Sequence, residues 1–262
     1  MGVLNVTPDS FSEKGLYFEK NRALEHGHKM VEEGADIIDV GGESTRPGSL
    51  RIDEEEERSR VIPVIEGLSK LVNIPISIDT YKANVAEAAI EAGASMINDI
   101  SGLRFDQHMP YIAAKYNVPV VIMHIKGVPE TMQFDTRYND LMEEIREYLK
   151  KSIDIAKSAG VKDDHIIVDP GIGFGKSYRQ NLVILNKLSY LKKLGKPILI
   201  GPSKKAFIGD ILGGLPPNER VEGTAASVAI SIMNGANIVR VHDVKVMSRV
   251  AKVADAIKRM DY

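Results

Sequence analysis

Three stretches of the chain repeat one pattern: EEGADIIDV (residues 32–40), EAGASMINDI (residues 91–100) and MNGANIVRV (residues 233–241). In each stretch a helical pattern ends at a Gly-Ala pair, and a short strand-like run follows. Glycine at this point allows the left-handed conformation in which helices commonly end. The repeat therefore predicts a chain in which helices alternate with strands.

Similar runs rich in Val and Ile recur along the rest of the chain. Because they are mostly continuous rather than alternating, they are typical of parallel strands buried on both faces. The expected strands are Gly2–Val6, Asp36–Val40, Ile76–Asp79, Ser95–Ile100, Val118–Met123, His165–Asp169, Pro197–Ile200 and Asn237–Val241. The expected helices are Asn21–Glu33, Asp53–Leu71, Lys82–Ala92, Arg137–Ala159, Arg179–Leu194, Glu222–Asn234 and Val244–Met260.

The number and order of these elements predict the fold. About eight strands alternating with about eight helices are the number of elements expected for an α/β protein of the (β/α)8 TIM barrel class. An open doubly wound sheet is the alternative, because strand counting does not separate the two. No linker rich in Pro, Gly and Ser divides the chain, so we expect a single domain over residues 1–262.

The composition excludes several classes of function. The 34 basic and 36 acidic side chains nearly cancel, which argues against nucleic acid or a membrane surface as a partner. The absence of cysteine excludes disulfides, thiolate nucleophiles and cysteine-bound zinc. No apolar run is long enough to span a bilayer and the first residues do not resemble a signal peptide, so we expect a cytoplasmic protein.

Polar residues stand at the carboxyl end of nearly every expected strand. In a parallel barrel these ends meet on one face, where side chains from distant parts of the chain can surround a ligand. A single polar residue there is more often a helix cap or an ion-pair partner, and Asp39 and Asp99 fit that interpretation. The full set is Asn5, Asp39, Asp79, Asn98, Asp99, Met123, His124, Asp169, Gly201–Lys205, Arg240 and His242.

Two long connections and two groups of anion-binding side chains belong to the same face. Thr7–Tyr17 and Glu43–Ile52 exceed the usual length of a βα loop and are predicted to be lids, with ordinary surface loops as the alternative. Arg240 and His242 alternate along the last strand beside Asn5 on the first, so together they can hold an anion and its hydrated Mg²⁺.

The segment Gly201–Lys205 suggests a second anion site. Ser203 is predicted to cap a helix that begins at Lys204, whose backbone N–H groups would bind the anion. Lys205 is expected to reach into the barrel mouth, while Lys204 points outward. The glycines around Phe174 fit no nucleotide-binding motif and are expected to let the chain fold over a flat ligand.

Eight motifs, in this order along the chain, resemble the dihydropteroate synthase family of pterin-binding enzymes. They are MGVLNVTPDSFSEKG (1–15), DVGGESTRPG (39–48), SIDTYK (77–82), MINDISG (96–102), VVIMHIKGVPETMQ (120–133), IIVDPGIGFGK (166–176), GPSKKAFIG (201–209) and GTAASVAISIMNGANIVRVHDV (223–244). The resemblance implies a TIM barrel that condenses 6-hydroxymethyl-7,8-dihydropterin pyrophosphate with 4-aminobenzoate. The products would be 7,8-dihydropteroate and pyrophosphate, a step of folate biosynthesis and the target of sulfonamides.

The same resemblance implies roles for particular residues, with Mg²⁺ as cofactor and a homodimer as the assembly. The implied pterin pocket contains Asp79, Asn98, Met123, Asp169, Phe174 and Lys205. The implied pyrophosphate and metal region contains Asn5, Arg240 and His242, with Asn5 as the metal ligand. The implied 4-aminobenzoate pocket contains Phe11, Thr45, Arg46, Pro47 and Ser203.

The chemistry expected of such a site is a dissociative, SN1-like substitution. An aromatic amine is unprotonated near neutral pH, so the difficult event is breaking the C–O bond to pyrophosphate. Arg240, His242 and Mg²⁺ would stabilise the leaving group, with Asp79 and Lys205 at the pterin and Asp9 approaching the cation. Family chains usually begin with a segment upstream of Met1, and the family's Ser-Arg-Lys is Ser203-Lys204-Lys205 here.

Two other functions remain as alternatives. A methyltransferase domain acting on methyltetrahydrofolate shares the barrel and the pterin carboxylates, but the ESTRPG loop (residues 43–48) argues against it. A non-catalytic pterin-binding barrel would lack the residues for the leaving group, whereas Asn5, Arg240 and His242 are all present. The sequence therefore favours the synthase.

Overall fold

The computed structural model describes residues 1–7 and 15–261, with no side-chain description for residues 15–19. The strands are β1 (Gly2–Asn5), β2 (Ile38–Gly41), β3 (Ile76–Asp79), β4 (Met96–Asp99), β5 (Val120–Met123), β6 (Ile166–Asp169), β7 (Leu199–Ile200) and β8 (Ile238–Val239). The helices are α1 (Gly15–Glu32), α2 (Glu54–Leu71), α3 (Ala83–Glu91), α4 (Met109–Tyr116), α5 (Leu141–Ser158), α6 (Tyr178–Asn186), α7 (Ala206–Ile211), α8 (Val221–Met233) and α9 (Val244–Arg259).

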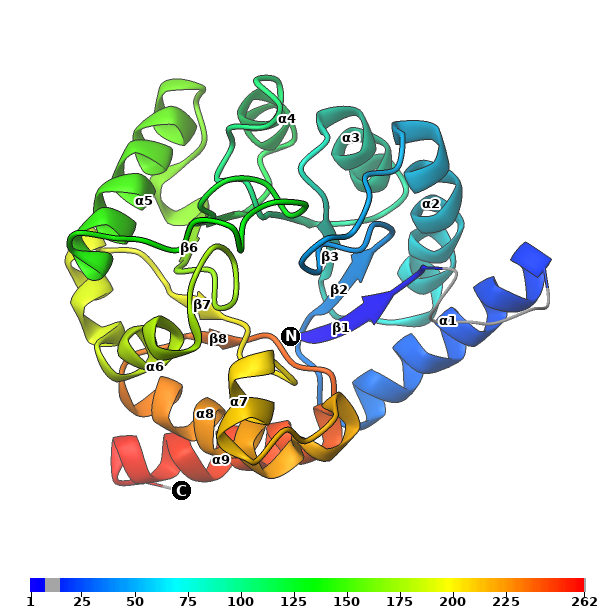
Figure 1. Ribbon diagram of the computed structural model, residues 1–262. Helices are drawn as coiled ribbons and strands as arrows, with labels where there is room; N and C mark the ends of the chain where they lie inside the picture. The colour runs from blue at the N-terminus through cyan, green and yellow to red at the C-terminus, as the bar shows by residue number, and fades with distance from the viewer. Residues whose placement is uncertain (8–14, 262) are drawn as a thin grey trace.

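The strands form a closed parallel barrel inside a ring of helices (Figure 1). Strands β1 to β6 pair in sequence order, and β7 pairs with β8. Two parallel bridges join these sheets, one between Val168 and Ile198 and one between Gly2 and Val241. Since Gly2 belongs to the first strand and Val241 follows the last, the second bridge closes the barrel. The predicted TIM barrel is confirmed, and the open sheet is excluded.

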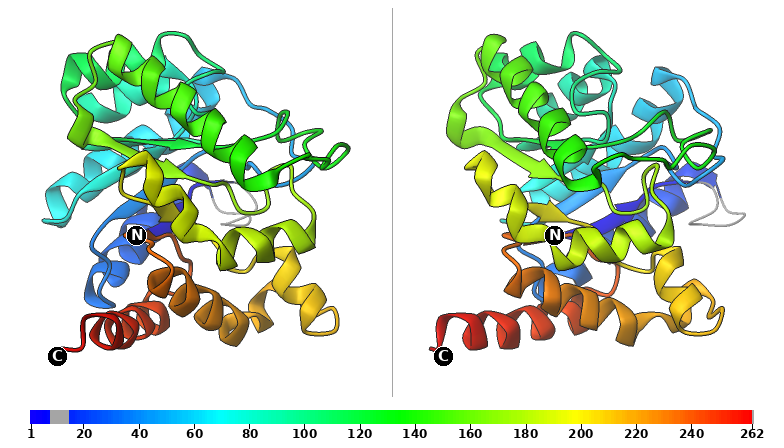
Figure 2. Two further views of the ribbon diagram at one scale, coloured as in Figure 1. Left: turned by 90° about the vertical axis from the view of Figure 1, so that its left-hand side faces the viewer. Right: turned by 60° about the vertical axis from the view of Figure 1, so that its left-hand side comes forward.

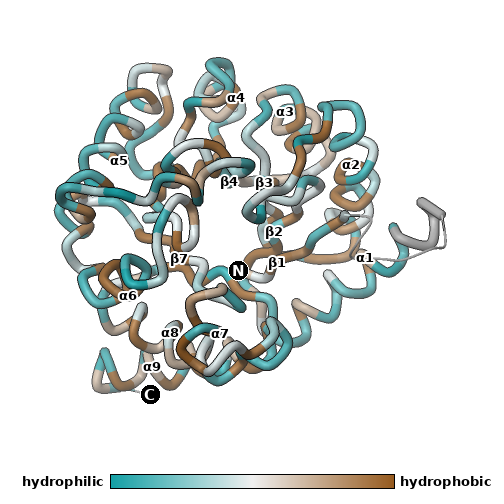
Figure 3. Tube along the Cα trace, viewed as in Figure 1, coloured by the Kyte–Doolittle hydropathy of each residue, from teal (hydrophilic) through white to brown (hydrophobic). Residues whose placement is uncertain are grey.

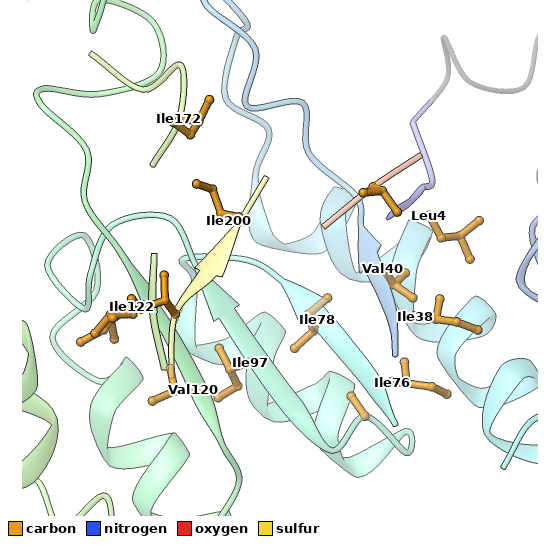
Figure 4. Close-up of a cluster of buried hydrophobic side chains, with 14 of the residues drawn as sticks. Leu4, Ile38, Val40, Ile76, Ile78, Ile97, Val120, Ile122, Ile172 and Ile200 are labelled. Carbon is orange, nitrogen blue, oxygen red and sulfur yellow. The ribbon is translucent and has the colours of Figure 1, made fainter. Parts of the chain in front are cut away.

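The main core lies between the barrel wall and the helices. Continuous Val and Ile runs supply one buried side chain to it at every second position, as Ile38 and Val40 do on β2 (Figure 4). Residues at the intervening positions point into the barrel, where Val121, Ile167 and Leu199 form a separate buried cluster. The hydropathy along the chain follows this arrangement, with apolar strands at the centre and helices that alternate between polar and apolar stretches (Figure 3).

The repeated Gly-Ala joint has the predicted conformation. Gly34, Gly93 and Gly235 have φ angles of 95°, 115° and 110°, which belong to the region that favours glycine. At Gly93 a Cβ would also lie 2.6 Å from the Cβ of Ser69, so the close approach of α2 leaves no space for a side chain. The joint therefore turns each helix sharply into the following strand.

Several predicted helices differ from the structure. Arg179–Leu194 is not one helix, because α6 ends at Asn186 and a 3₁₀ helix over Leu188–Leu194 follows. The helix predicted from Arg137 begins at Leu141, where the Asp140 side chain accepts the backbone N–H of Glu143. Helices α4 and α7 were not predicted, and both are only one or two turns long. In the described part of the chain no helix combines the length and hydropathy needed to cross a membrane.

Candidate active site

The connections that follow the strands gather at one end of the barrel (Figure 2). This end carries the polar residues that stand at the strand termini. Asn5, Gly41 and Asp79 are consecutive partners in the register of β1, β2 and β3, and Asn98 is paired with Asp79 on β4. The parallel register thus brings residues from separate motifs to the same level of the barrel mouth.

A hydrogen-bonded cluster of side chains lies at the centre of this mouth. The guanidinium of Arg240 donates to Asp39 Oδ2 and to Asp79 Oδ2, each at 2.6 Å. The amide of Asn98 donates to the same oxygen of Asp39 at 3.0 Å. Asp39 is fully buried, and its Oδ1 has no hydrogen-bond partner among the described residues. The cluster joins residues of β2, β3 and β4 to Arg240, which directly follows β8 and is 201 positions from Asp39.

The charged groups at the barrel mouth shift one another's pKa values. Burial raises the pKa of Asp79, and the neighbouring guanidinium of Arg240 partly offsets that effect. Burial raises the pKa of Asp169 to about 6, against the effect of the Gly171 N–H bonded to it and the positive charge of Lys205. Burial lowers the pKa of Lys205 to about 8, and the charge of Arg240 acts in the same direction. Such paired perturbations in a cleft are typical of functional sites.

Apolar side chains form one wall beside these charges. Met123 is buried, and it belongs to a cluster with Tyr81, Ile100 and the partly buried Phe174. The Phe174 ring lies under the ammonium of Lys205, with 4.7 Å between the nitrogen and the ring centroid. A flat ring placed against this wall would therefore meet carboxylates and an ammonium at its edge.

The glycine-rich connection after β6 packs tightly on the connection after β5. At Gly171, where φ is 69°, a Cβ would lie 2.0 Å from the backbone oxygen of His124. Lys176 is only 1% exposed, and its ammonium lies 2.9 Å from both His124 Nδ1 and the Phe174 oxygen. Burial lowers the pKa of Lys176 to about 7 and that of His124 well below its usual value. These contacts fix the conformation of the segment around Phe174, and the expectation that it folds over a flat ligand stays a prediction.

The anion-binding prediction for the Gly201–Lys205 segment needs correction. Ser203 does not cap a helix, because α7 begins at Ala206 and its N-cap position is Lys205, without a side-chain cap. The preceding Lys204 has φ of 58°, a left-handed conformation that prevents the helix from starting there. Ser203 Oγ instead accepts the backbone N–H of His242 at 3.2 Å and lies 3.0 Å from His242 Nδ1.

Lys204 is also placed differently from the expectation. It does not point outward into solvent but is half-buried, with its ammonium 3.1 Å from Asp243 Oδ1. Burial and the charges of Arg240, Lys204, Lys205 and Arg46 together lower the pKa of His242 to about 3. The imidazole is therefore neutral at pH 7 within a strongly electropositive region.

The long connection after β2 forms the rim of the mouth. Thr45 is half-buried, whereas Arg46 and Pro47 are exposed. Ser49 Oγ donates to the backbone oxygens of Ser44 and Arg46, at 2.5 and 2.7 Å, and closes this segment into a compact turn. The predicted aminobenzoate residues of this loop thus lie at the entrance, above the strand-end cluster.

The remaining predicted residues concern the metal and the first loop. Asn5 ends β1 and is half-buried at the mouth, 3.8 Å from the position that a Cβ on Gly41 would occupy. No group of three or more His, Cys, Asp or Glu residues able to hold a metal ion occurs within residues 1–7 and 15–261. Asp9 and Phe11 lie outside the described residues, as does most of the predicted lid Thr7–Tyr17.

Among the supporting residues, sequence reasoning interpreted Asp39 and Asp99 correctly and missed Lys176. Asp39 is an ion-pair partner as expected, because its carboxylate pairs with Arg240, and it also accepts from the amide of Asn98. Its position at the end of β2, like that of Asp79 on β3, was the signal for this role. Lys176 was not singled out, because a lysine in a glycine-rich segment is usually solvated. Asp99 is structural as expected, since its carboxylate accepts the backbone N–H groups of Ser101 and Leu103.

Comparison with known proteins agrees with this geometry. The pterin-binding enzyme family matches residues 1–242. The chain is 52% identical to the dihydropteroate synthase of Bacillus subtilis, over 98% of this chain and 87% of that protein. It is 55% identical to that of Clostridium beijerinckii, over 99% and 94% of the two chains.

A solved structure gives the same result. The crystal structure of a Clostridium difficile dihydropteroate synthase, determined with pteroic acid present, superimposes with a TM-score of 0.93 at 49% identity. The superposition covers 98% of this chain and 95% of that one. This chain belongs to the pterin-binding enzyme family, among the dihydropteroate synthases, which are transferases of folate synthesis.

Proposed function

We propose that this chain, as a single domain, joins 4-aminobenzoate to 6-hydroxymethyl-7,8-dihydropterin diphosphate by a dissociative substitution at the barrel mouth. The observation that carries the proposal is the convergence of Asp79, Asp169, Lys205 and Arg240, whose charges act on one another from four separate motifs. The diphosphate leaves with the electron pair of the C–O bond. The amine nitrogen then bonds to the methylene carbon and loses a proton.

The pterin is assigned to the buried part of the site. Its aminopyrimidine edge carries N–H donors, which suit the carboxylates of Asp79 and Asp169 and the amide oxygen of Asn98. Lys205 provides an ammonium for a ring oxygen or nitrogen, and Met123 and Phe174 pack on the ring faces. The contact between Lys205 and Phe174 places the ammonium and the apolar wall on the same side of the pocket.

The leaving diphosphate is assigned to Arg240 and His242. A guanidinium has five N–H donors, and the bonds to Asp39 and Asp79 engage two of them, so it can bind a phosphate oxygen while it stays oriented. The positive charges around His242 favour an anion there. Removing one such contact to developing charge typically costs ~3 kcal/mol of transition-state stabilisation.

Asn5 is assigned as the protein ligand of Mg²⁺. A single amide oxygen fits the preference of this ion for oxygen ligands, but Mg²⁺ requires an octahedral set that the described residues do not supply. The ion would therefore be held mainly by the diphosphate and by water, with Asn5 orienting it. When bound, Mg²⁺ neutralises charge on the diphosphate.

The 4-aminobenzoate is assigned to the rim of the mouth. We assign Thr45, Arg46 and Pro47 of the connection after β2 and the hydroxyl of Ser203 to its binding. Phe11, which lies outside the described residues, is assigned there from the family resemblance alone. The aromatic amine needs no strong base, because its conjugate acid is already deprotonated at neutral pH. Asp9 would approach the methylene cation, and closure of the loops would exclude water that could capture it.

A direct assay and one variant test this assignment. The wild-type protein with pterin diphosphate, 4-aminobenzoate and Mg²⁺ should release pyrophosphate and form 7,8-dihydropteroate in equal amounts. Arg240→Ala should reduce turnover by at least ~100-fold, in line with the value above, while binding of a pterin without diphosphate changes little. Loss of pterin binding with unchanged turnover per bound substrate would contradict the role of Arg240.

We also propose that the protein is a homodimer, assembled through α8 and α9. These helices pack against each other and leave Ile230, Met233, Val253 and Ile257 between 48% and 63% exposed. Exposed apolar side chains on adjacent helices are typical of an interface. Sedimentation equilibrium should give twice the chain mass, and Val253→Glu with Ile257→Glu should give a monomer, whereas Tyr111→Glu on α4 should not.

A further inference from the structure

A buried ion cluster connects the second loop (residues 43–52) to the barrel wall. The ammonium of Lys82, which follows β3, lies 2.5 Å from Glu43 Oε2 and 2.5 Å from Glu57 Oε2 on α2. Lys82 is 9% exposed and Glu57 is 1% exposed. The hydroxyl of Tyr81 donates to the other oxygen of Glu43 at 2.8 Å. Both carboxylate oxygens of Glu43 are therefore held by residues that follow β3.

Burying these charges costs free energy of folding. Two carboxylates share one ammonium, burial raises the pKa of Glu57, and Glu57 Oε1 has no hydrogen-bond partner among the described residues. Replacing a buried ion cluster by well-packed apolar side chains is often neutral or stabilising. Stability alone therefore does not account for the cluster, and a role in placing Glu43 does.

Glu43 begins the turn that carries the proposed aminobenzoate residues. Ser49 closes this turn by donating to the backbone oxygens of Ser44 and Arg46, and the Gly48 N–H donates to the backbone oxygen of Pro129, on the connection after β5, at 3.2 Å. The direction in which the turn points is set where the second loop meets the barrel. At its first end that contact is made by Glu43 with Lys82 and Tyr81.

The other end of the second loop meets the same aromatic ring. Arg51 lies with its guanidinium carbon 5.7 Å from the ring centroid of Tyr81 and 5.5 Å from that of Phe105. It also pairs with Glu130 at 2.6 Å, on the connection after β5. Tyr81 thus contacts both ends of the loop, one through its hydroxyl and one through its ring face. The residues directly after β3 form the support on which the loop rests.

We propose that Lys82 is a positioning residue for the second substrate, acting through Glu43 on the second loop. This inference rests on the proposed function, because it assumes that the loop contacts 4-aminobenzoate. Lys82 itself does not touch the reacting atoms. Removing its ammonium releases Glu43 from α2 and lets the turn move relative to the strand-end cluster, which binds the pterin independently.

The kinetic test uses Lys82→Met, which keeps an unbranched side chain one atom shorter but removes its charge. The KM for 4-aminobenzoate should rise at least tenfold, about 1.4 kcal/mol, while the KM for pterin diphosphate changes less than twofold. The matched control is Lys115→Met, because Lys115 pairs with Glu87 at 2.7 Å on the outside of the barrel. An equal rise of both KM values would mean a general structural role and would overturn the inference.

A double-mutant cycle tests the route through Glu43. Glu43→Gln should raise the same KM, and Lys82→Met should add little to it, since both remove one contact. Glu57→Gln leaves the ammonium paired with Glu43 and should change the KM less than either. If Lys82→Met does not fold, Glu43→Gln alone carries the test, and an unchanged KM for 4-aminobenzoate in that variant rejects the inference.

Limited proteolysis gives a readout that does not depend on catalysis. Trypsin cleavage after the exposed Arg51, followed by mass spectrometry, should be several-fold faster in Lys82→Met than in the wild type or in Lys115→Met. Unchanged cleavage together with an unchanged KM would refute the positioning role. If the wild type formed no dihydropteroate, the proposed function would fail, whereas accelerated cleavage would still establish that Lys82 holds the loop.

Discussion

The two halves of the candidate site are built in different ways. The half proposed to bind the pterin consists of strand-end residues such as Asp79 and Asp169, which are 12% and 5% exposed. The half proposed to bind 4-aminobenzoate consists of loop residues, of which Arg46 and Pro47 are exposed. The first half is placed by the register of the parallel barrel, and the second by a few contacts where a loop meets that barrel.

The two substrates would therefore meet binding surfaces of different rigidity. Polar groups held on adjacent strands can discriminate one flat heterocycle, because leaving any of them unpaired in a buried pocket is costly. A loop held by a few contacts is more easily displaced. The buried half should therefore tolerate substitution poorly, and the loop half should tolerate it well.

The largest expected effect lies in the pterin half. Asp169→Asn keeps an acceptor for the Gly171 N–H but removes the negative charge, and should weaken binding of a pterin without diphosphate by ~100-fold, from the ~3 kcal/mol of a charged hydrogen bond. In the loop half, Thr45→Val should raise only the KM for 4-aminobenzoate, by about fivefold. Calorimetry and steady-state kinetics measure the two effects.

Asp164→Asn is the control for that comparison, because Asp164 is exposed at the opposite end of β6. It should change neither constant. Equal losses in Asp169→Asn and Thr45→Val would mean that the two halves do not differ in the way their construction indicates.

A second expected effect concerns pH and belongs to the pterin half alone. Because the pKa of Lys205 is lowered to about 8, its ammonium is charged at pH 7 and loses its proton as the pH rises to 9. Asp169, with its pKa of about 6, stays ionised over that range, and Asp79, whose pKa is raised to about 7, gains negative charge in both the wild type and Lys205→Met. Pterin affinity should fall about tenfold between pH 7 and 9, whereas Lys205→Met should start near the lower value.

The comparison of wild type with Lys205→Met isolates this group, since titration of the pterin itself affects both proteins equally. Thr45→Val should retain the wild-type pH dependence. A parallel decline in Lys205→Met would assign the titration to another group and would remove Lys205 from the pterin site.

The sequence predicted the positions of the strand-end residues far better than it predicted their hydrogen-bond partners. Strand positions were predictable because continuous Val and Ile runs end at polar residues, and a parallel register brings those ends together. The partners of Arg240 were not predictable. Strand alternation decides to which face a residue's Cβ points, but it does not decide where the end of a long side chain lies. The position of Asp39 at the end of β2 indicated an ion-pair partner, but nothing local indicated that this partner would be Arg240.

Local conformation explains the other failures. The Ser203 cap was predicted from residue type, but the left-handed φ of Lys204 delays the helix to Ala206. That conformation depends on α8, where Thr224 Oγ1 accepts the Lys204 N–H and Arg220 donates to the Lys204 oxygen. Thr224 and Arg220 are 20 and 16 positions from Lys204 in the sequence, so the residues next to Lys204 do not predict these contacts. The burial of Lys176 against His124 was missed for the same reason, because the two residues are 52 positions apart in the sequence.

The smallest expected effect lies in the loop half, at its more exposed end. Arg51→Gln removes the pair with Glu130, which is 2.6 Å long but whose side chains are 47% and 27% exposed. An exposed pair contributes about 1 kcal/mol or less, so the KM for 4-aminobenzoate should rise about two- to threefold with unchanged pterin affinity.

Arg137→Gln is the control for this pair, because Arg137 bonds Asp135 at 2.9 Å with 92% of its side chain exposed. The difference between Arg51→Gln and wild type should shrink in high salt, since screening already weakens the wild-type pair. A salt-independent loss as large as that of Asp169→Asn would mean that the rim is as rigidly specified as the strand ends. The loop would then belong to the buried half, and the distinction between the halves would rest on exposure alone.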